Sequence, residues 1–222
     1  MTAPNRIGIA AWQSGDSIWR VEARGGVEGV AIHVDDTPFL LRSSDDQPLP
    51  TLAEQYVRGD ELHLSFPQFD DLSRGQCDFG FRLVIRPVAF GSFVPNQNRC
   101  VFELLVSVQT TLLDAHPTLD LVSPADQVTR LDGDGLVTNA VHLADNKSFS
   151  AAVLLGPQDA PFTSVVEDPG ALRLRLFGEF LEKGVIRRAR PWVVLDRSGS
   201  GIDAEFVRTS LDTLATSPLP LA

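Results

Sequence analysis

The segment Ala171–Leu195, with the sequence ALRLRLFGEFLEKGVIRRARPWVVL, contains two runs whose pattern is that of β-strands. In the first run leucine occupies every second position, and arginines lie between the leucines. This period of two gives an extended chain one apolar and one polar face, and it does not fit the longer period of a helix. Gly178 and Gly184 bracket a short connection, since glycine accepts the positive φ angles of tight reversals. The segment, here named the Arg-rich segment, is therefore predicted to be a β-hairpin.

The second strand of this hairpin is predicted over Val185–Leu195. Its first half carries arginines at both odd and even positions, whereas its end, WVVL, reads as buried. Pro191 cannot donate to a ladder, so an edge or a bulge is expected there. If the two strands pair, the arginines of the first strand lie near those of the second.

The Arg-rich segment is strongly basic in an acidic chain. It has a local charge of 6 − 2 = +4, whereas the whole chain has a formal net charge of −10. Guanidinium groups suit carboxylates and phosphates, which predicts an anion site. Glu182 is included because the nearby arginines would hold it ionised and oriented, although no catalytic residue is assigned. The candidate ligand-binding residues are Arg173, Arg175, Glu182, Arg187, Arg188 and Arg190.

Internal pairing is the alternative reading of the same arginines. The segment Ile32–Leu72 holds nine acidic residues against Arg42 and Arg58, an excess of 9 − 2 = 7 negative charges. These carboxylates would be a supply of partners within the chain. The arginines would then stabilise the fold and bind no ligand.

The remainder of the chain is predicted to be mostly β-strand. The run Arg99–Leu113 is the longest apolar stretch, and its Val, Phe and Thr content favours a strand that crosses the middle of a sheet. Asp203–Ala215 is predicted to be a helix capped by Asp203. The polar stretch Arg42–Pro50 and the proline-bounded stretch Asp114–Pro124 are predicted to be loops. Further strands are predicted over 6–12, 18–23, 27–34, 53–58, 61–66, 79–88, 136–143, 149–155 and 162–166.

These elements predict an all-β fold of a single domain, residues 1–222. Fifteen prolines, seventeen glycines and short β-branched runs favour that class. About a dozen strands with one short C-terminal helix indicate a large antiparallel β-sandwich, of a jelly-roll or supersandwich-like kind.

Composition excludes several functions and suggests a compartment. An acidic chain lacks the cationic surface that general nucleic-acid binding needs. We find neither a signal-peptide pattern at the start nor an apolar run long enough to span a membrane, so a soluble cytoplasmic protein is expected. Cys77 and Cys100 lie too far apart in the expected strand pairing for a disulfide and are predicted to be free thiols.

Motifs for metals, nucleotides and nucleophilic catalysis are weak or missing. His33 and Asp35 share a strand face, but two ligands are too few for a site. The sequence Asp132-Gly133-Asp134-Gly135 resembles the front half of a calcium loop, yet no glutamate follows at the required position. The glycine pairs lack the setting of a phosphate-binding loop, and no Gly-x-Ser-x-Gly elbow is present. No metal and no cofactor is therefore predicted.

The first functional hypothesis is a binding or assembly module that uses the arginine surface for an anionic small molecule, a sugar or an acidic protein surface. The alternative is a carbohydrate-active enzyme, epimerase- or lyase-like, with an Arg/Glu/His cluster in the concave face of the sandwich; this rests on fold-level analogy alone. A self-associating structural subunit is a third reading, and it would show an exposed apolar patch.

Overall fold

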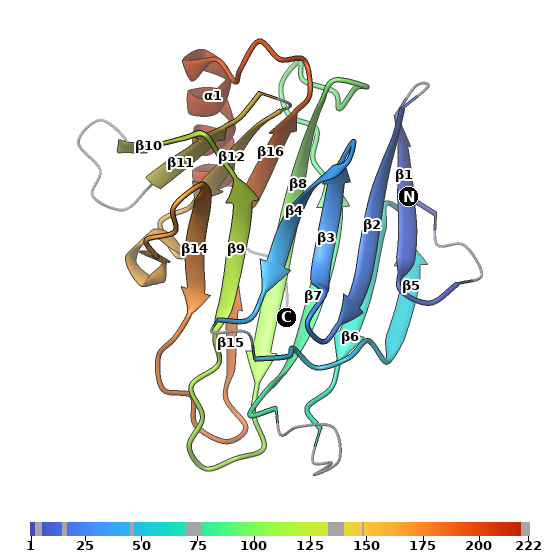
Figure 1. Cartoon of the computed structure of the whole chain (residues 1–222), viewed down its shortest axis with the longest axis vertical. Helices are drawn as coiled ribbons and strands as arrows, with labels where there is room; N and C mark the ends of the chain where they lie inside the picture. Colours follow the sequence, from blue (N-terminus) through green and yellow to red (C-terminus); the bar gives the residue numbers. More distant parts are fainter. Residues whose placement is uncertain are drawn as a thin grey trace.

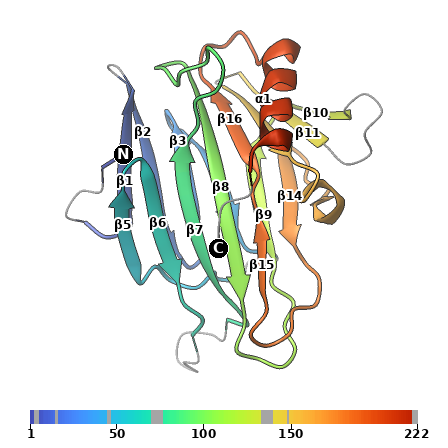
Figure 2. The ribbon, with the colours of Figure 1, turned by 180° about the vertical axis from the view of Figure 1, so that it is seen from behind.

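The computed structural model describes residues 1–2, 6–14, 17–44, 47–69, 77–132, 140–147 and 149–218. Two antiparallel sheets pack face to face, and one helix covers part of the outer face of the larger sheet (Figures 1 and 2). The predicted all-β sandwich with a C-terminal helix is therefore confirmed. The calcium-like glycine turn falls on residues 133–135 and lies outside the described residues.

The smaller sheet has seven strands, and all of its neighbouring strands run antiparallel. Their order across the sheet is β1 (Ile9–Ser14), β2 (Ser17–Gly25), β3 (Gly29–Val34), β4 (Thr37–Arg42), β9 (Leu119–Pro124), β14 (Ala171–Phe177) and β13 (Ser164–Val165).

The larger sheet has nine strands and is centred on the long strand β8 (Arg99–Gln109). Strand β15 (Ile186–Ala189) pairs with β8 outside the main order. A short 3-10 helix, η1 (Ala160–Phe162), follows the strand β12. The order of the other strands is β10 (Gln127–Asp132), β11 (Ala140–Asp145), β12 (Ser150–Leu155), β16 (Trp192–Asp196), β8, β7 (Gly80–Pro87), β6 (Glu61–Phe66) and β5 (Glu54–Arg58).

The Arg-rich segment is not a hairpin, so that prediction is wrong. Its first strand, β14, pairs with β9 and β13 in the smaller sheet, whereas β15 and β16 pair with β8 in the larger one. The connection, residues 178–185, is long enough to cross from one sheet to the other. Leu174 on β14 and Ala189 on β15 both belong to the core between the sheets. The two strands therefore meet face to face across the core, and their outward arginines lie on opposite sides of the molecule.

Several other strand predictions also need correction. The predicted loop Asp114–Pro124 contains β9, because Pro124 ends a strand of good formers and does not prevent it. Strands β4 and β10 were not predicted. The predicted strand over 162–166 is reduced to the two residues of β13. Strand β8 does occupy the middle of a sheet, as predicted, and both cysteines are free thiols.

The C-terminal helix α1 (Ala204–Thr216) gives the larger sheet a second hydrophobic core on its outer face. Asp203 caps the helix as predicted, since its carboxylate accepts a hydrogen bond from the Phe206 backbone amide at 2.7 Å. Val207 and Leu214 pack on Trp192 and its neighbours. Strands β12 and β16 are consequently buried on both faces, whereas β15 and the strands β5–β7 are not covered by the helix (Figure 2).

No helix among the described residues is long and apolar enough to cross a membrane.

The dipeptide Arg190-Pro191 divides one long strand into β15 and β16. The pairs Ala189–Val106 and Trp192–Glu103 enclose the same number of residues on both strands, so no bulge is inserted. β12, the neighbour on the other side of β16, ends at Leu155, one position past its pair with Trp192. Below Pro191 the strand thus changes from an interior strand to an edge strand. This change positions the candidate site.

Candidate binding pocket beside the edge strand β15

A pocket of about 550 Å³ lies along the open edge of β15. We name it the β15 pocket. It is bounded by the chain that follows β12, by the end of β14, and by the last turn of α1. Its lining consists of Arg187–Arg190, residues 156–159, Phe162, Thr163, Leu176–Glu179, Leu105, Ala215 and Ser217.

Arg190 is a structural member of the pocket wall. The residue is 8% exposed, and its guanidinium donates hydrogen bonds to backbone carbonyls at the end of α1. The Nη1–Pro218 O distance is 2.8 Å, and the Nη2–Leu214 O distance is 3.3 Å. Helix C-termini leave such carbonyls without intrahelical partners, and a basic side chain satisfies them. The donors of Arg190 that make these bonds are therefore committed to the fold.

Asp159 closes the upper end of the open edge. One of its carboxylate oxygens accepts a hydrogen bond from the Arg190 backbone amide at 3.1 Å. Burial raises the pKa of Asp159 above its ordinary value, and the hydrogen bond and charge of Arg190 offset part of that increase. The carboxylate thus provides the hydrogen-bond acceptor that a backbone carbonyl of β12 would provide if this strand continued past Leu155.

Arg187 forms an exposed ion pair at the lower end of the pocket. Its Nη1 lies 2.8 Å from Oε2 of Glu179, and both side chains are largely in contact with solvent. Exposed pairs of this kind contribute little to stability, because solvent screens them and two long side chains must be ordered. Glu179 can therefore be displaced by a ligand at small cost.

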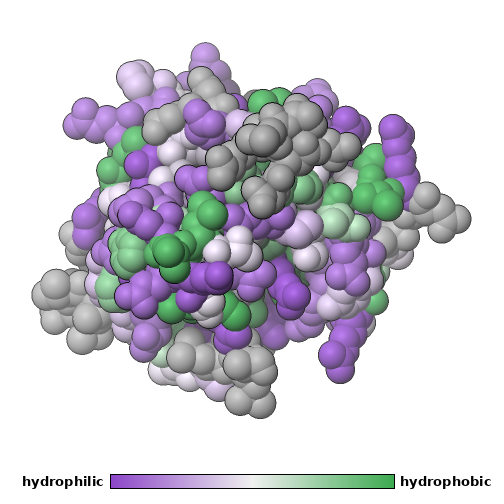
Figure 3. All heavy atoms as spheres, turned by 90° about the horizontal axis from the view of Figure 1, so that it is seen from below, coloured by the Kyte–Doolittle hydropathy of each residue, from purple (hydrophilic) through white to green (hydrophobic). Residues whose placement is uncertain are grey.

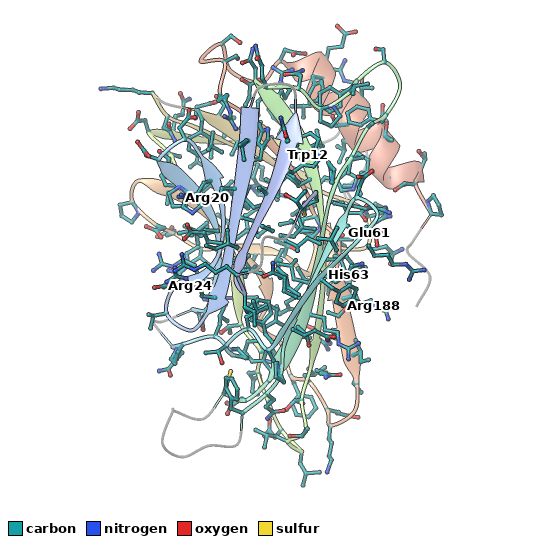
Figure 4. All side chains as sticks on the ribbon, turned by 90° about the vertical axis from the view of Figure 1, so that its right-hand side faces the viewer. Trp12, Arg20, Arg24, Glu61, His63 and Arg188 are labelled. Carbon is teal, nitrogen blue, oxygen red and sulfur yellow. The ribbon has the colours of Figure 1, made fainter. Side chains whose placement is uncertain are left out.

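Arg188 differs from both of these arginines. It is exposed, lines the pocket, and has no hydrogen-bond or ion-pair partner among the described residues. Its neighbour across the β8 ladder is Ser107, which carries no charge. Figure 4 shows Arg188 on the same face of the larger sheet as Glu61 and His63, whereas Arg20 and Arg24 lie on the opposite side of the molecule.

The two remaining candidate arginines, Arg173 and Arg175, do not reach the pocket. They lie on the outer face of the smaller sheet and share the carboxylate of Asp120, which is 0% exposed. The Nε atoms of Arg173 and Arg175 lie 2.7 and 3.0 Å from its two oxygens. This group, named the Asp120 cluster, is an internal ion-pair network.

The predicted six-residue site is therefore split into parts. The structure brings Arg187, Arg188 and Arg190 together and places Arg173 and Arg175 elsewhere. Glu182 is exposed in the loop before β15 and is not part of the pocket lining. Within the described part of the chain, the ion pairs of these arginines are with Asp120, Asp168, Glu179 and Glu103, which lie outside Ile32–Leu72.

A separate polar cluster lies on the outer face of the larger sheet, where β6, β7 and β8 are adjacent. Nε2 of His63 is 3.0 Å from Oε2 of Glu61, and the ring of Tyr56 stacks on His63 with a 4.7 Å centroid separation. Arg86 bridges Glu61 and the buried Glu103, at 3.6 and 2.9 Å. Sequence reasoning did not find this cluster, although Glu61 and His63 alternate along β6 with the core residues Leu62 and Leu64 and so point away from the core.

Residues with other potential chemistry are separated in the fold. No group of three or more His, Cys, Asp or Glu side chains that could hold a metal ion occurs in the described part of the chain. His33 lies 3.8 Å from Glu22, and its pKa is lowered mainly by burial and secondly by Arg20. Burial raises the pKa of both Cys77 and Cys100, so neither thiol is activated as a nucleophile.

The sequence matches no model of a known protein family, and it matches no curated protein.

Proposed function

We propose that this protein is a binding protein that takes a carboxylate- or phosphate-bearing ligand or partner in the β15 pocket. The observation that carries the proposal is Arg188. It is an exposed arginine at the rim of a pocket of about 550 Å³, and no described residue pairs with it. A planar guanidinium in this position has its donors available for the two oxygens of an anionic group.

The neighbouring charges support the same conclusion. Arg187 supplies a second cation whose partner Glu179 is exposed, so its charge is only weakly neutralised. Arg190 holds the pocket wall in place through α1 and through Glu103 at 3.9 Å. An anionic ligand is therefore attracted by the first two arginines and positioned by a wall that the third one stabilises.

The test is a thermal-shift titration with succinate, inorganic phosphate and glutamate-rich peptides. A ligand at about 100 times its dissociation constant stabilises a domain by roughly 2.7 kcal/mol. We expect a saturable shift in the wild type that is lost in Arg188→Ala. The matched control is Arg58→Ala, which removes an exposed arginine without a described partner from β5, the edge strand on the opposite side of the same sheet. An equal shift in Arg188→Ala and wild type would contradict the proposal.

A carbohydrate-active enzyme is the second candidate function, and it is favoured by the cluster around His63. An exposed tyrosine ring stacked on a histidine that contacts a carboxylate offers a sugar platform beside an acid/base pair. This cluster lies on the outer face of the larger sheet, since the alternating residues Leu62, Leu64 and Phe66 belong to the core. Turnover of a glycoside or uronate panel that Glu61→Gln abolishes and Arg188→Ala leaves unchanged would favour this function over the first.

A further inference from the structure

We propose that the partner of the β15 pocket is an extended acidic segment of another protein, which binds by adding a strand to the free edge of β15. This inference rests on the proposed function and specifies its ligand. The pocket combines a cation with an exposed strand edge, and a small anion uses only the cation. A peptide uses both, because strand addition draws affinity from backbone hydrogen bonds.

The direction of the backbone groups on β15 follows from two hydrogen bonds above it. The Leu104 amide donates to the Pro191 carbonyl at 3.0 Å, so residue 191 faces β8. The Arg190 amide donates instead to Asp159, on the side away from β8. In an antiparallel ladder the direction alternates from residue to residue. Arg188 and Ile186 therefore direct their N–H and C=O groups away from β8, toward the open edge.

These edge groups have no partner in the described part of the chain. β15 pairs only with β8 among the described strands, and neither Ile186 nor Arg188 makes a described hydrogen bond on its other side. Asp159 occupies the position beside Arg190, which limits an added strand to the stretch below it. Ile186 itself is 53% exposed, so this edge is accessible from solvent. The loops at this lower end of the molecule expose apolar side chains among hydrophilic ones (Figure 3).

The side chains around the edge specify the pattern of the added strand. On the outer side of β15 the pocket presents Arg188, and on the inner side it presents Leu176 and Phe177. Phe162 lies beside the edge and is 65% exposed. Successive residues of a strand point to opposite sides. The sequence that fits therefore alternates acidic residues, which meet Arg188, with apolar residues, which meet the phenylalanines.

A second copy of this chain is a poor occupant of the same edge. An antiparallel two-fold pairing of β15 with itself brings the arginines of both copies into opposition, and like charges across a ladder are destabilising. Charged residues on edge strands commonly prevent such self-pairing. The chain also carries a net charge of −10, so its copies repel one another outside the arginine surface. An acidic foreign strand does not meet the first obstacle, because it places carboxylates and not arginines opposite Arg188.

The first experiment measures fluorescence anisotropy with a synthetic peptide of alternating glutamate and valine. A block peptide of the same composition is its control. Two N-methylated versions remove the N–H of every second residue, one version on odd and the other on even positions. We expect one N-methylated version to bind about tenfold more weakly while the other is unaffected, because only one set of N–H groups faces β15. Equal effects of the two versions would overturn strand addition.

The second experiment removes an N–H group from the protein and leaves the peptide unchanged. Ile186→Pro removes an N–H that faces the edge, leaves the ladder with β8 intact, and lies at the first residue of a strand, where proline is accepted. Ile186→Ala removes the side chain but keeps that N–H, and it is the matched control. We expect about a tenfold loss of peptide affinity in the first variant only, with the succinate shift unchanged in both.

The possible outcomes separate this inference from the proposed function. Peptide binding that persists in Ile186→Pro overturns strand addition, while the Arg188-dependent succinate shift still supports an anion site. If Ile186→Pro unfolds, the N-methylated peptides decide the question with the wild-type protein alone. If neither succinate nor peptide binds and Arg188→Ala forms dimers, both proposals fail, and the arginines serve to prevent self-pairing of the edge.

Discussion

Arg175 and Arg188 lie on the outer faces of the two sheets of one sandwich, yet only Arg175 is neutralised by the fold. Strand β14 has neighbours on both sides, and β9 places Asp120 directly opposite Arg175. Strand β15 has a neighbour on one side, and the residue opposite Arg188 is Ser107. Two arginines in similar local sequences thus differ because their cross-strand neighbours differ. An arginine becomes available to a ligand where the sheet ends.

The Asp120 cluster should show the largest effect on stability. Asp120→Asn removes the carboxylate charge and leaves Arg173 and Arg175 without their shared counter-charge in a largely buried place. Removing one partner of a buried ion pair typically costs about 3 kcal/mol or more of the free energy of unfolding. Urea unfolding at neutral pH measures this loss. Asp126→Asn, at an exposed position just after β9, is the control and should change stability by less than about 0.5 kcal/mol.

Substitutions of Arg190 test whether this arginine stabilises the fold while Arg188 is free to bind a ligand. Arg190→Ala leaves the carbonyls of Leu214, Ser217 and Pro218 without their donor, and we expect a loss of about 2 kcal/mol. Arg190→Lys should recover less than half of it, because a single ammonium group does not reproduce the planar fork. Urea unfolding with hydrogen exchange at the last turn of α1 measures both effects. A loss as small as that of Arg188→Ala would remove the distinction between the two arginines.

The comparison also shows what sequence patterns determine. The alternation of leucine and arginine correctly predicts that β14 is a strand with its leucines inside, and Asp203 correctly predicts the start of α1. A period of two fixes the faces of a strand but not its neighbours. The hairpin prediction was therefore wrong, because the two strands belong to different sheets. The partner of Arg175 lies on β9, a stretch that was predicted to be a loop because prolines flank it.

The pocket was beyond sequence reasoning for a related reason. Its walls come from the chain after β12, the end of β14, β15 and the end of α1, which are far apart in sequence. Asp159 lies in a turn between two prolines and carries no local signal of its contact with Arg190. Only Arg187, Arg188 and Arg190 were recognisable, because these three arginines occur within four residues. Sequence thus pointed to some of the residues that line the candidate pocket but not to where the pocket lies in the fold.

Asp159 gives a pH dependence whose sign is set by its raised pKa. The folded state binds the proton more tightly than the unfolded state, in which the carboxyl group has its ordinary pKa near 3.8, so protonation stabilises the fold. We expect wild-type stability, relative to Asp159→Asn, to rise as pH falls through the raised pKa and to level off below 3.8. Asp159→Ala, which leaves the Arg190 amide without an acceptor, should lose about 1 kcal/mol at neutral pH. Urea unfolding across the acid range measures the free energy of unfolding of wild type and Asp159→Asn at each pH. A wild-type advantage over Asp159→Asn that falls with decreasing pH would contradict the raised pKa of Asp159.

Substitution of Glu179 should have the smallest effect on stability. It also tests whether Arg187, like Arg188, is available to a ligand. It is the exposed carboxylate that pairs with Arg187 at 2.8 Å, so it competes with any anion that enters the β15 pocket. Glu179→Gln should leave the free energy of unfolding within about 0.5 kcal/mol of wild type, because exposed pairs contribute little. The same variant should bind succinate or an acidic peptide about threefold more tightly, since one unfavourable charge is removed, and high salt should reduce that gain. Urea unfolding measures the stability, and calorimetric titration at low and high salt measures the affinity and its salt dependence. An unchanged or weaker affinity would mean that Arg187 takes no part in binding, and the anion would then depend on Arg188 alone.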